Sequence, residues 1–243
     1  VDGFHSYAGW LFFTLLALAL VWAVQMTPWL YKSGAVPRAD VPLRHDLVAA
    51  SLLPFVALML ISTILSAFLT QPELGYPAKA VVMAAALWFF RLALRRLPWA
   101  WDTTAFALGA VVGLSWVLTS TQSDPDLAAT LQTWPVVGRG VWVAFRLVGT
   151  VLLIPVIEEL FFRGYVLARL DGPQPWRRVL AVVVSSVAFA ALHGRWVEAG
   201  LAGVIFAVVM LRRGRVTDAI LAHVTANLVV AVFAVAKGDF SLI

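Results

Sequence analysis

The chain contains no cysteine, which excludes disulfides, thiolate metal sites and a cysteine nucleophile. It is also poor in charge: charged residues make up 13% of its 243 residues, whereas soluble domains carry about 25%. No run of lysine and arginine is long enough for a nucleic-acid patch. We therefore expect no nucleic-acid partner, and we attribute the net charge of +5 to orientation in a membrane.

Hydrophobic residues make up 62% of the sequence and gather in runs close to the roughly 20 residues that a helix needs to cross a bilayer. The alternation typical of a β-barrel is absent, so helices must satisfy the backbone groups. The sequence predicts an all-α fold, a polytopic membrane helical bundle of about eight transmembrane helices in the lipid bilayer. The expected spans are 9–27, 47–69, 78–97, 102–121, 141–169, 179–194, 197–212 and 217–236.

Basic residues are distributed unevenly between the two sets of span ends. One set would hold Lys32, Arg38, Arg44, Arg91, Arg95, Arg96, Arg163, Arg169, Arg177, Arg178, Arg212, Arg213 and Arg215. The other would hold Lys79, Arg139, Arg195 and Lys237, with Arg146 near an outer end. Because positive charge marks the cytoplasmic side, we expect both termini outside the cytoplasm. The excess of arginine over lysine suggests a bacterial inner membrane.

Two adjacent acids, Glu158 and Glu159, lie within an apolar run, where ionisable residues indicate function. Glu159 and Arg163 are four residues apart on one helix face, so we expect them to pair as structural support. Glu158 points elsewhere and has no local partner, which suits it to take a proton from water. Pro155, one turn earlier, is expected to loosen the helix and admit water.

Three further polar residues lie in other predicted spans. His193 ends one of them, and His223 and Asn227 share a helix face in the last one. Together with Glu158 they suit amide hydrolysis: Glu158 and His193 would activate water, and His223 and Asn227 would stabilise the oxyanion. Glu158, His193 and His223 also suit a metal such as zinc, although no His-Glu-x-x-His helix and no Gly-x-Ser-x-Gly elbow occurs.

Three motifs carry a resemblance to a known family: Glu158-Glu159-x-x-x-Arg163, Phe189-x-x-x-His193 and His223-x-x-x-Asn227. In this order they resemble the motifs of the CPBP family, the CAAX-protease and bacteriocin-processing (Abi) family of eight-helix intramembrane endopeptidases, over about residues 141–236. The resemblance implies a water-activating Glu158 beside His193, an oxyanion pair in His223 and Asn227, and either glutamate or metal dependence. It divides the chain into N-terminal helices, 1–140, and catalytic core helices, 141–243.

A shorter pattern lies at the N-terminus, where residues 4–13 resemble the terminal motif of exosortases, His-x-x-x-Gly-Trp-x-Phe-Phe. An interfacial histidine with an aromatic belt explains the pattern equally well. Because the chain begins with Val1, the resemblance suggests an exosortase-associated protein or the C-terminal half of an exosortase–CPBP fusion. The expected substrate is a membrane-associated peptide or protein tail.

Two alternatives remain open, a transporter or proton pathway built on intramembrane Glu and His, and a non-catalytic membrane scaffold. Helix arithmetic also poses a problem for the peptidase. It puts Glu158 in the cytoplasmic half of its span and His193 about 22 Å along the next one, near the outer end. The mechanism requires the two side chains to meet, in a cavity that we expect to open toward the cytoplasm.

Overall fold

The computed structural model describes residues 41–120, 125–238 and 240, and the predicted span 9–27 and the motif at 4–13 lie outside them. The described residues from Pro42 onward belong to one compact unit. Their secondary structure is helical, and no strand occurs in this described part, which confirms the all-α fold.

Each predicted span after the first coincides with a helix or a helix pair. The helices are α2 (Leu47–Phe68), α3 (Tyr76–Phe89), α4 (Arg91–Leu94), α5 (Thr103–Leu118), α6 (Pro125–Thr133), α7 (Val136–Val148), α8 (Ile154–Glu159), α9 (Ala168–Leu170), α10 (Pro175–Ala190), α11 (Trp196–Arg213) and α12 (Val216–Lys237). Short turns of helix, η2 (Leu43–His45) and η3 (Pro72–Gly75), precede α2 and α3.

The predicted fifth span is a continuous helix, Val136–Leu170, that runs from α7 to α9. It is widened into π-helical turns at η4 (Gly149–Leu153) and η5 (Leu160–Leu167). Such turns are rare and often mark functional sites. Glu158 and Glu159 occupy the short α-helical stretch between them.

Three described helices are long and apolar enough to cross a membrane: α2, the helix Val136–Leu170 and α12. Thr103–Leu118 is a shorter apolar helix. Leu60, Phe68 and Leu118 are among the many large apolar side chains exposed on the outside, while charged groups such as Glu159 and Arg163 are fully buried. This inside-out distribution is that of an integral membrane protein, although the count of eight spans is not established.

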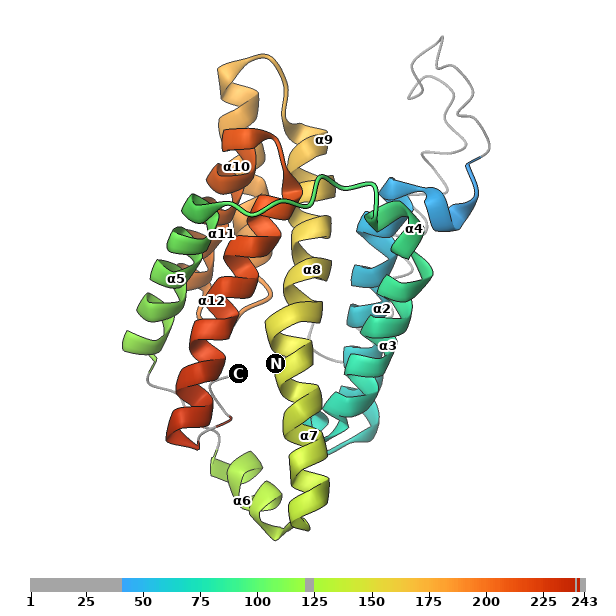
Figure 1. Ribbon diagram of the computed structural model, residues 1–243, viewed down its shortest axis with the longest axis vertical. Helices are drawn as coiled ribbons and strands as arrows, with labels where there is room; N and C mark the ends of the chain where they lie inside the picture. The colour runs from blue at the N-terminus through green and yellow to red at the C-terminus, as the bar shows by residue number, and fades with distance from the viewer. Residues whose placement is uncertain (1–40, 121–124, 239, 241–243) are drawn as a thin grey trace, which may run out of the picture. The chain divides into compact units, whose positions relative to one another are not determined.

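The helices pack as neighbouring pairs around the helix Val136–Leu170 (Figure 1). Helix α12 lies between α5 and α8, while α2 and α3 pack together on the other side. Helices α10 and α11 form a further pair that contacts η5 and α12. The long helix therefore lies at the centre of the described bundle, where three predicted site helices can meet.

The segment 122–135, which we expected to be a connection, contains the helix α6. Its Leu127 and Leu131 are four residues apart and buried, so a narrow apolar face holds this short helix in place. The prediction missed it because two apolar positions in a short, polar segment do not give a clear helical period.

The predicted cytoplasmic ends are joined by charge contacts. Asp102 caps α5 by accepting a hydrogen bond from the Ala105 amide at 2.7 Å, and it also contacts the guanidinium groups of Arg212 and Arg213. The amide hydrogen bond and then the two arginines lower the pKa of Asp102 to about 2. These contacts fix the start of α5 against the end of α11.

Helix α5 approaches α12 closely because glycines face it. A Cβ atom on Gly109 would lie 2.2 Å from the carbonyl oxygen of Ala222, and one on Gly113 would lie 2.5 Å from that of Ala226. Real Cβ atoms essentially never come so close to backbone. The two glycines therefore set the position of the part of α12 that carries His223.

We expect Gly109→Ala to lower the free energy of unfolding by about 1–3 kcal/mol, because the added methyl group forces α5 away from α12. Thermal unfolding in detergent, followed by tryptophan fluorescence, measures this change. Gly140→Ala is the matched control, since no atom lies within 4 Å of a Cβ atom there. Equal stability of the two variants would contradict the close packing of α5 on α12.

Candidate active site

A cavity of about 310 Å³ lies between the central helices, and all four predicted catalytic residues line it. Glu158 comes from α8, His193 from the α10–α11 connection, and His223 and Asn227 from α12. The other lining residues are Glu73, Tyr76, Lys79, Val112, Gly113, Trp116, Arg146, Thr150, Ile154, Phe189, Ala202, Phe206, Ala226 and Val230. The structure therefore brings together the side chains that the three motifs singled out.

Glu158 is a buried carboxylate without a fixed partner. Its residue is 6% exposed, and its Oε2 atom has no hydrogen-bond partner among the described residues. A buried polar atom left unpaired is costly, so its retention favours a functional role. A carboxylate that faces a cavity in this way is free to accept a hydrogen bond from water.

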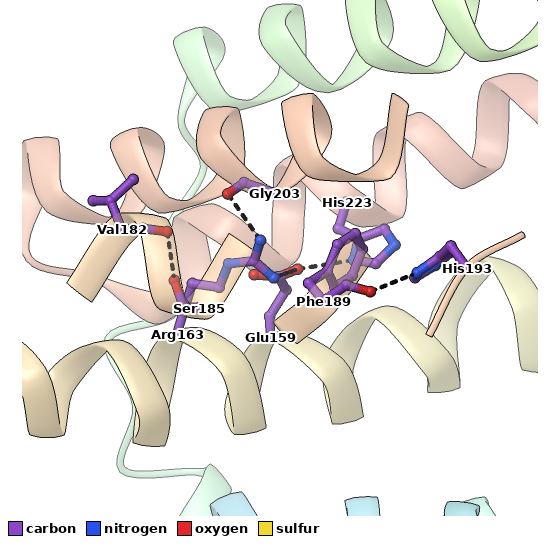
Figure 2. A network of polar contacts seen from close by, with 8 residues as sticks. All are labelled: Glu159, Arg163, Val182, Ser185, Phe189, His193, Gly203 and His223. Carbon is purple, nitrogen blue, oxygen red and sulfur yellow. Dashed lines mark hydrogen bonds and ion pairs between the residues drawn. The ribbon is translucent and has the colours of Figure 1, made fainter. Parts of the chain in front are cut away.

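Glu159 lies at the centre of a buried network, shown in Figure 2. Its Oε1 atom is 2.9 Å from Arg163 Nη1, which confirms the predicted i, i+4 pair, and 2.9 Å from His223 Nδ1. We did not predict the contact with His223. Glu159 thus holds the His223 ring as well as Arg163, and sequence spacing cannot reveal a contact between helices so far apart in the chain.

Arg163 crosses the bundle interior instead of lying at a membrane surface. Its Nη2 atom donates to the Gly203 carbonyl oxygen on α11 at 2.8 Å, and its side chain is fully buried. A Cβ atom on Gly203 would lie 3.1 Å from Nη2, so glycine makes room for this contact. Counting Arg163 among the cytoplasmic end charges was therefore wrong, because its charge is compensated inside the protein.

The two site histidines are oriented in similar ways. His223 Nδ1 faces the Glu159 carboxylate, and His193 Nδ1 lies 2.8 Å from the Phe189 carbonyl oxygen. Both oxygens are acceptors, so each Nδ1 carries the hydrogen, and Nε2 is the nitrogen left for chemistry in the cavity. The His223 ring also stacks on Phe206, with 4.7 Å between ring centroids.

His193 and Glu158 line the same cavity, and the position of α10 explains how this is possible. Helix α10 begins at Pro175 and ends at Ala190, so His193 lies in the turn that follows it and not on a helix as predicted. At 1.5 Å per residue, Ala190 lies about 22 Å from the start of α10, and Glu158 about 18 Å from the end of α9 at Leu170. The two therefore lie at similar depths, which resolves the conflict in the helix arithmetic.

The turn that holds His193 is tied to the end of α5 by Arg195. Its Nη1 atom donates to the Trp116 carbonyl oxygen at 2.9 Å, its guanidinium lies 4.4 Å from the centroid of the Trp116 ring, and it also contacts Thr119. Its Nη2 atom further bonds Glu198 at 3.0 Å. Arg195 is therefore the residue that fixes the α10–α11 connection.

Asn227 is anchored by a carbonyl group that Pro155 leaves free. In the π-helical turn the Ile154 amide bonds the Gly149 oxygen, five residues back, so the next amide would bond Thr150. Pro155 has no amide hydrogen, and Asn227 Nδ2 donates to the Thr150 oxygen instead, at 2.8 Å. The expected effect of Pro155 on the helix thus has a specific consequence. Thr150 is a site residue that the sequence analysis missed.

The cavity extends away from the arginine-rich helix ends. It reaches Glu73, Lys79 in the first turn of α3 and Arg146 on α7, which lie at the opposite helix ends. The cavity thus extends toward the helix ends opposite to those that we expected to face the cytoplasm. At the α9–α10 end of the bundle, η5 packs against α10.

The residues that line this cavity do not fit a metal site. Among the described residues, no group of three His, Asp or Glu side chains is placed to hold a metal ion. Glu159 and the Phe189 carbonyl bind the Nδ1 atoms of the two histidines and leave only Nε2 of each ring to face the cavity. We therefore derive no chemical step through zinc at Glu158, His193 and His223.

Comparison with known proteins gives one family match. Residues 140–229 match the family model described as type II CAAX prenyl endopeptidase Rce1-like. A search of curated proteins gave no match. A search of solved structures likewise gave none.

The matched segment contains all three motifs and all four predicted catalytic residues, and it ends within α12, two residues beyond Asn227. Through this segment, the chain is similar to the Rce1-like family of type II CAAX prenyl endopeptidases.

Proposed function

We propose that the chain hydrolyses a peptide bond in a membrane-associated substrate by means of a water molecule activated by Glu158. The observation that supports this most is the unpaired, buried Glu158 carboxylate in a cavity that His193, His223 and Asn227 also line. A carboxylate without a partner can accept the proton of an attacking water. His193 Nε2 faces the same cavity and is suited to assist this transfer.

The oxyanion would be stabilised from α12. Glu159 accepts a hydrogen bond from His223 Nδ1 and so fixes the ring, and a ring with a hydrogen on both nitrogens donates from Nε2. Asn227 uses one amide hydrogen for the Thr150 carbonyl and has a second one to offer. Two donors held from behind are the arrangement that oxyanion stabilisation needs.

In the proposed mechanism, the substrate enters the site as an extended peptide segment of a membrane-associated protein. Supporting this, the cavity combines the polar site with apolar walls from Val112, Ile154 and Val230. A functional link to an exosortase module, an inner bacterial membrane and outward-facing termini remain proposals drawn from the sequence.

We expect the purified chain, reconstituted in liposomes with membrane-anchored peptides, to cleave a peptide bond and to continue doing so after treatment with 1,10-phenanthroline. Mass spectrometry of the products identifies the bond, and the chelator tests the metal-free mechanism. Loss of cleavage with the chelator and recovery with zinc would overturn the glutamate mechanism. Ion or proton flux across the liposome membrane without cleavage would favour the transporter instead.

A further inference from the structure

A basic cluster lies in the same cavity as Glu158 but away from the catalytic residues. We use this term for Lys79 and Arg146 together with the Glu73 carboxylate between them. Arg146 Nη1 contacts Glu73 Oε2, and Lys79 Nζ lies 3.8 Å from Glu73 Oε1. The side chains of Lys79 and Arg146 are 13% and 12% exposed, and that of Glu73 is 37% exposed. Two largely buried cations therefore face the cavity beside a more accessible carboxylate.

The cluster is rigidly built. The Arg146 guanidinium lies 4.3 Å from the centroid of the Tyr76 ring, and Trp142 Nε1 donates to the Glu73 carbonyl oxygen at 3.0 Å. The Tyr76 hydroxyl lies 2.9 Å from Thr150 Oγ1. A Cβ atom on Gly149 would lie 2.5 Å from the Tyr76 ring, so the glycine gives that ring its place. Aromatic support of this kind fixes the direction of the cation before any ligand arrives.

Among the described residues, no partner takes up all the hydrogen-bond donors of the Lys79 ammonium group. Its 3.8 Å contact with Glu73 is an ion pair longer than a hydrogen bond, and its other described contact is with the face of the Tyr76 ring, 5.3 Å from the centroid. An ammonium group has three donors and favours an anionic oxygen ligand. Ionisable groups that line a cavity in a membrane protein usually mark the path of a substrate.

The distance between the cluster and Glu158 corresponds to the length of a short extended peptide. Arg146 and Glu158 are twelve positions apart on one helix, which corresponds to about 18 Å at 1.5 Å per residue. An extended peptide covers this distance in about five residues, and in fewer when the Arg146 side chain reaches inward. A group bound at the cluster would thus determine which peptide bond lies at Glu158.

We propose that the basic cluster binds a carboxylate of the peptide substrate, either its C-terminal carboxylate or an Asp or Glu side chain near the scissile bond. The inference rests on the proposed function, because it assigns the recognition of the substrate to the same cavity. Glu73 pairs with Lys79 and Arg146 when no substrate is bound, and it competes with the substrate carboxylate for these two cations.

The test measures peptide binding in the Glu158→Gln background, so that no turnover is needed. Three fluorescent peptides of alanine and leucine serve as probes: one with a free C-terminal carboxylate, one with a C-terminal amide, and the amide with aspartate as last residue. We expect the free acid to bind at least about 10-fold more tightly than the amide in detergent micelles, as for a charge-assisted contact in a partly buried site. Tight binding of the aspartyl amide would show that the cluster binds side-chain carboxylates. Weak binding of the aspartyl amide would show that it binds the C-terminal carboxylate.

Variants of the cluster should change this preference in opposite directions. Lys79→Gln should reduce the preference for the free acid over the amide to less than about 3-fold. Glu73→Gln should increase this preference, because the competing carboxylate is gone. Arg139→Gln, on the same helix α7 but lining a separate pocket, is the control and should leave it unchanged.

A merely structural cluster would behave differently, because Glu73→Gln would then weaken the binding of all three peptides alike. Equal binding of the free acid, the amide and the aspartyl amide by the parent protein would overturn the inference while leaving cleavage intact. A carboxylate preference without any cleavage by the wild-type chain would instead overturn the proposed function and retain the binding site.

Discussion

Glu158→Gln is expected to lower kcat/KM for peptide cleavage by at least about 100-fold, since removal of a general base costs about 100- to 10,000-fold. Gln fills the same space, but it cannot take a proton from water. Because the Glu158 side chain makes no described ion pair, the substitution should leave stability unchanged or slightly increased. Release of a fluorescent product from a membrane-anchored peptide measures the rate.

The unfolding midpoint of this variant must be measured alongside its activity. The chain has 11 tryptophans, so intrinsic fluorescence reports unfolding without a label. Asp126→Asn is the matched control, because Asp126 is an exposed acid on α6, outside the cavity. Residual activity above about 10% of wild type in a folded Glu158→Gln protein would rule out Glu158 as the base that activates water.

Glu159→Gln is expected to act mainly on stability. The change leaves the fully buried Arg163 guanidinium opposite a neutral group, and Arg163 Nε already lacks a partner among the described residues. Breaking a buried ion pair from one side costs about 3–5 kcal/mol, so the unfolding midpoint should fall strongly. Thermal or denaturant unfolding in detergent measures the loss, and Asp171→Asn is the matched control.

Asp171 forms an ion pair with Arg178, whose side chain is 60% exposed, and an exposed pair contributes only about 0–1 kcal/mol. The variants of the two adjacent glutamates should therefore have clearly different effects. Glu158→Gln should cause the greater loss of activity per folded molecule, and Glu159→Gln the greater loss of stability. If the two variants lost stability equally, the assignment of Glu159 to structural support would be wrong.

The sequence predicted much of the site because its chemistry is unusual for its surroundings. Glu158, Glu159 and Arg163 stand out in an apolar run, and spacing alone predicted that Glu159 pairs with Arg163, as the structure confirms. The same reasoning placed His223 and Asn227 on one face of a helix, and both line the cavity. The catalytic roles of these residues stay predictions until the variants are measured.

Contacts between distant helices could not be predicted in this way. No local pattern links Glu159 to His223 or Arg195 to Trp116, because each contact depends on how helices far apart in the chain come together. The sequence did contain one usable signal for Thr150. A proline inside a span leaves a carbonyl group without its donor, and a polar side chain on a neighbouring helix is then needed to satisfy it.

The amino-acid sequence by itself determined that the chain is a bundle of apolar helices with a few ionisable groups inside, because hydrophobic runs and helical spacing are local properties. The tertiary structure decided the depth of His193, the burial of Arg163 and the direction of the cavity. Each of these depends on where a helix ends and what packs beside it. The early end of α10 and the close approach of α5 to α12 arise from packing over the whole bundle, which no single segment encodes.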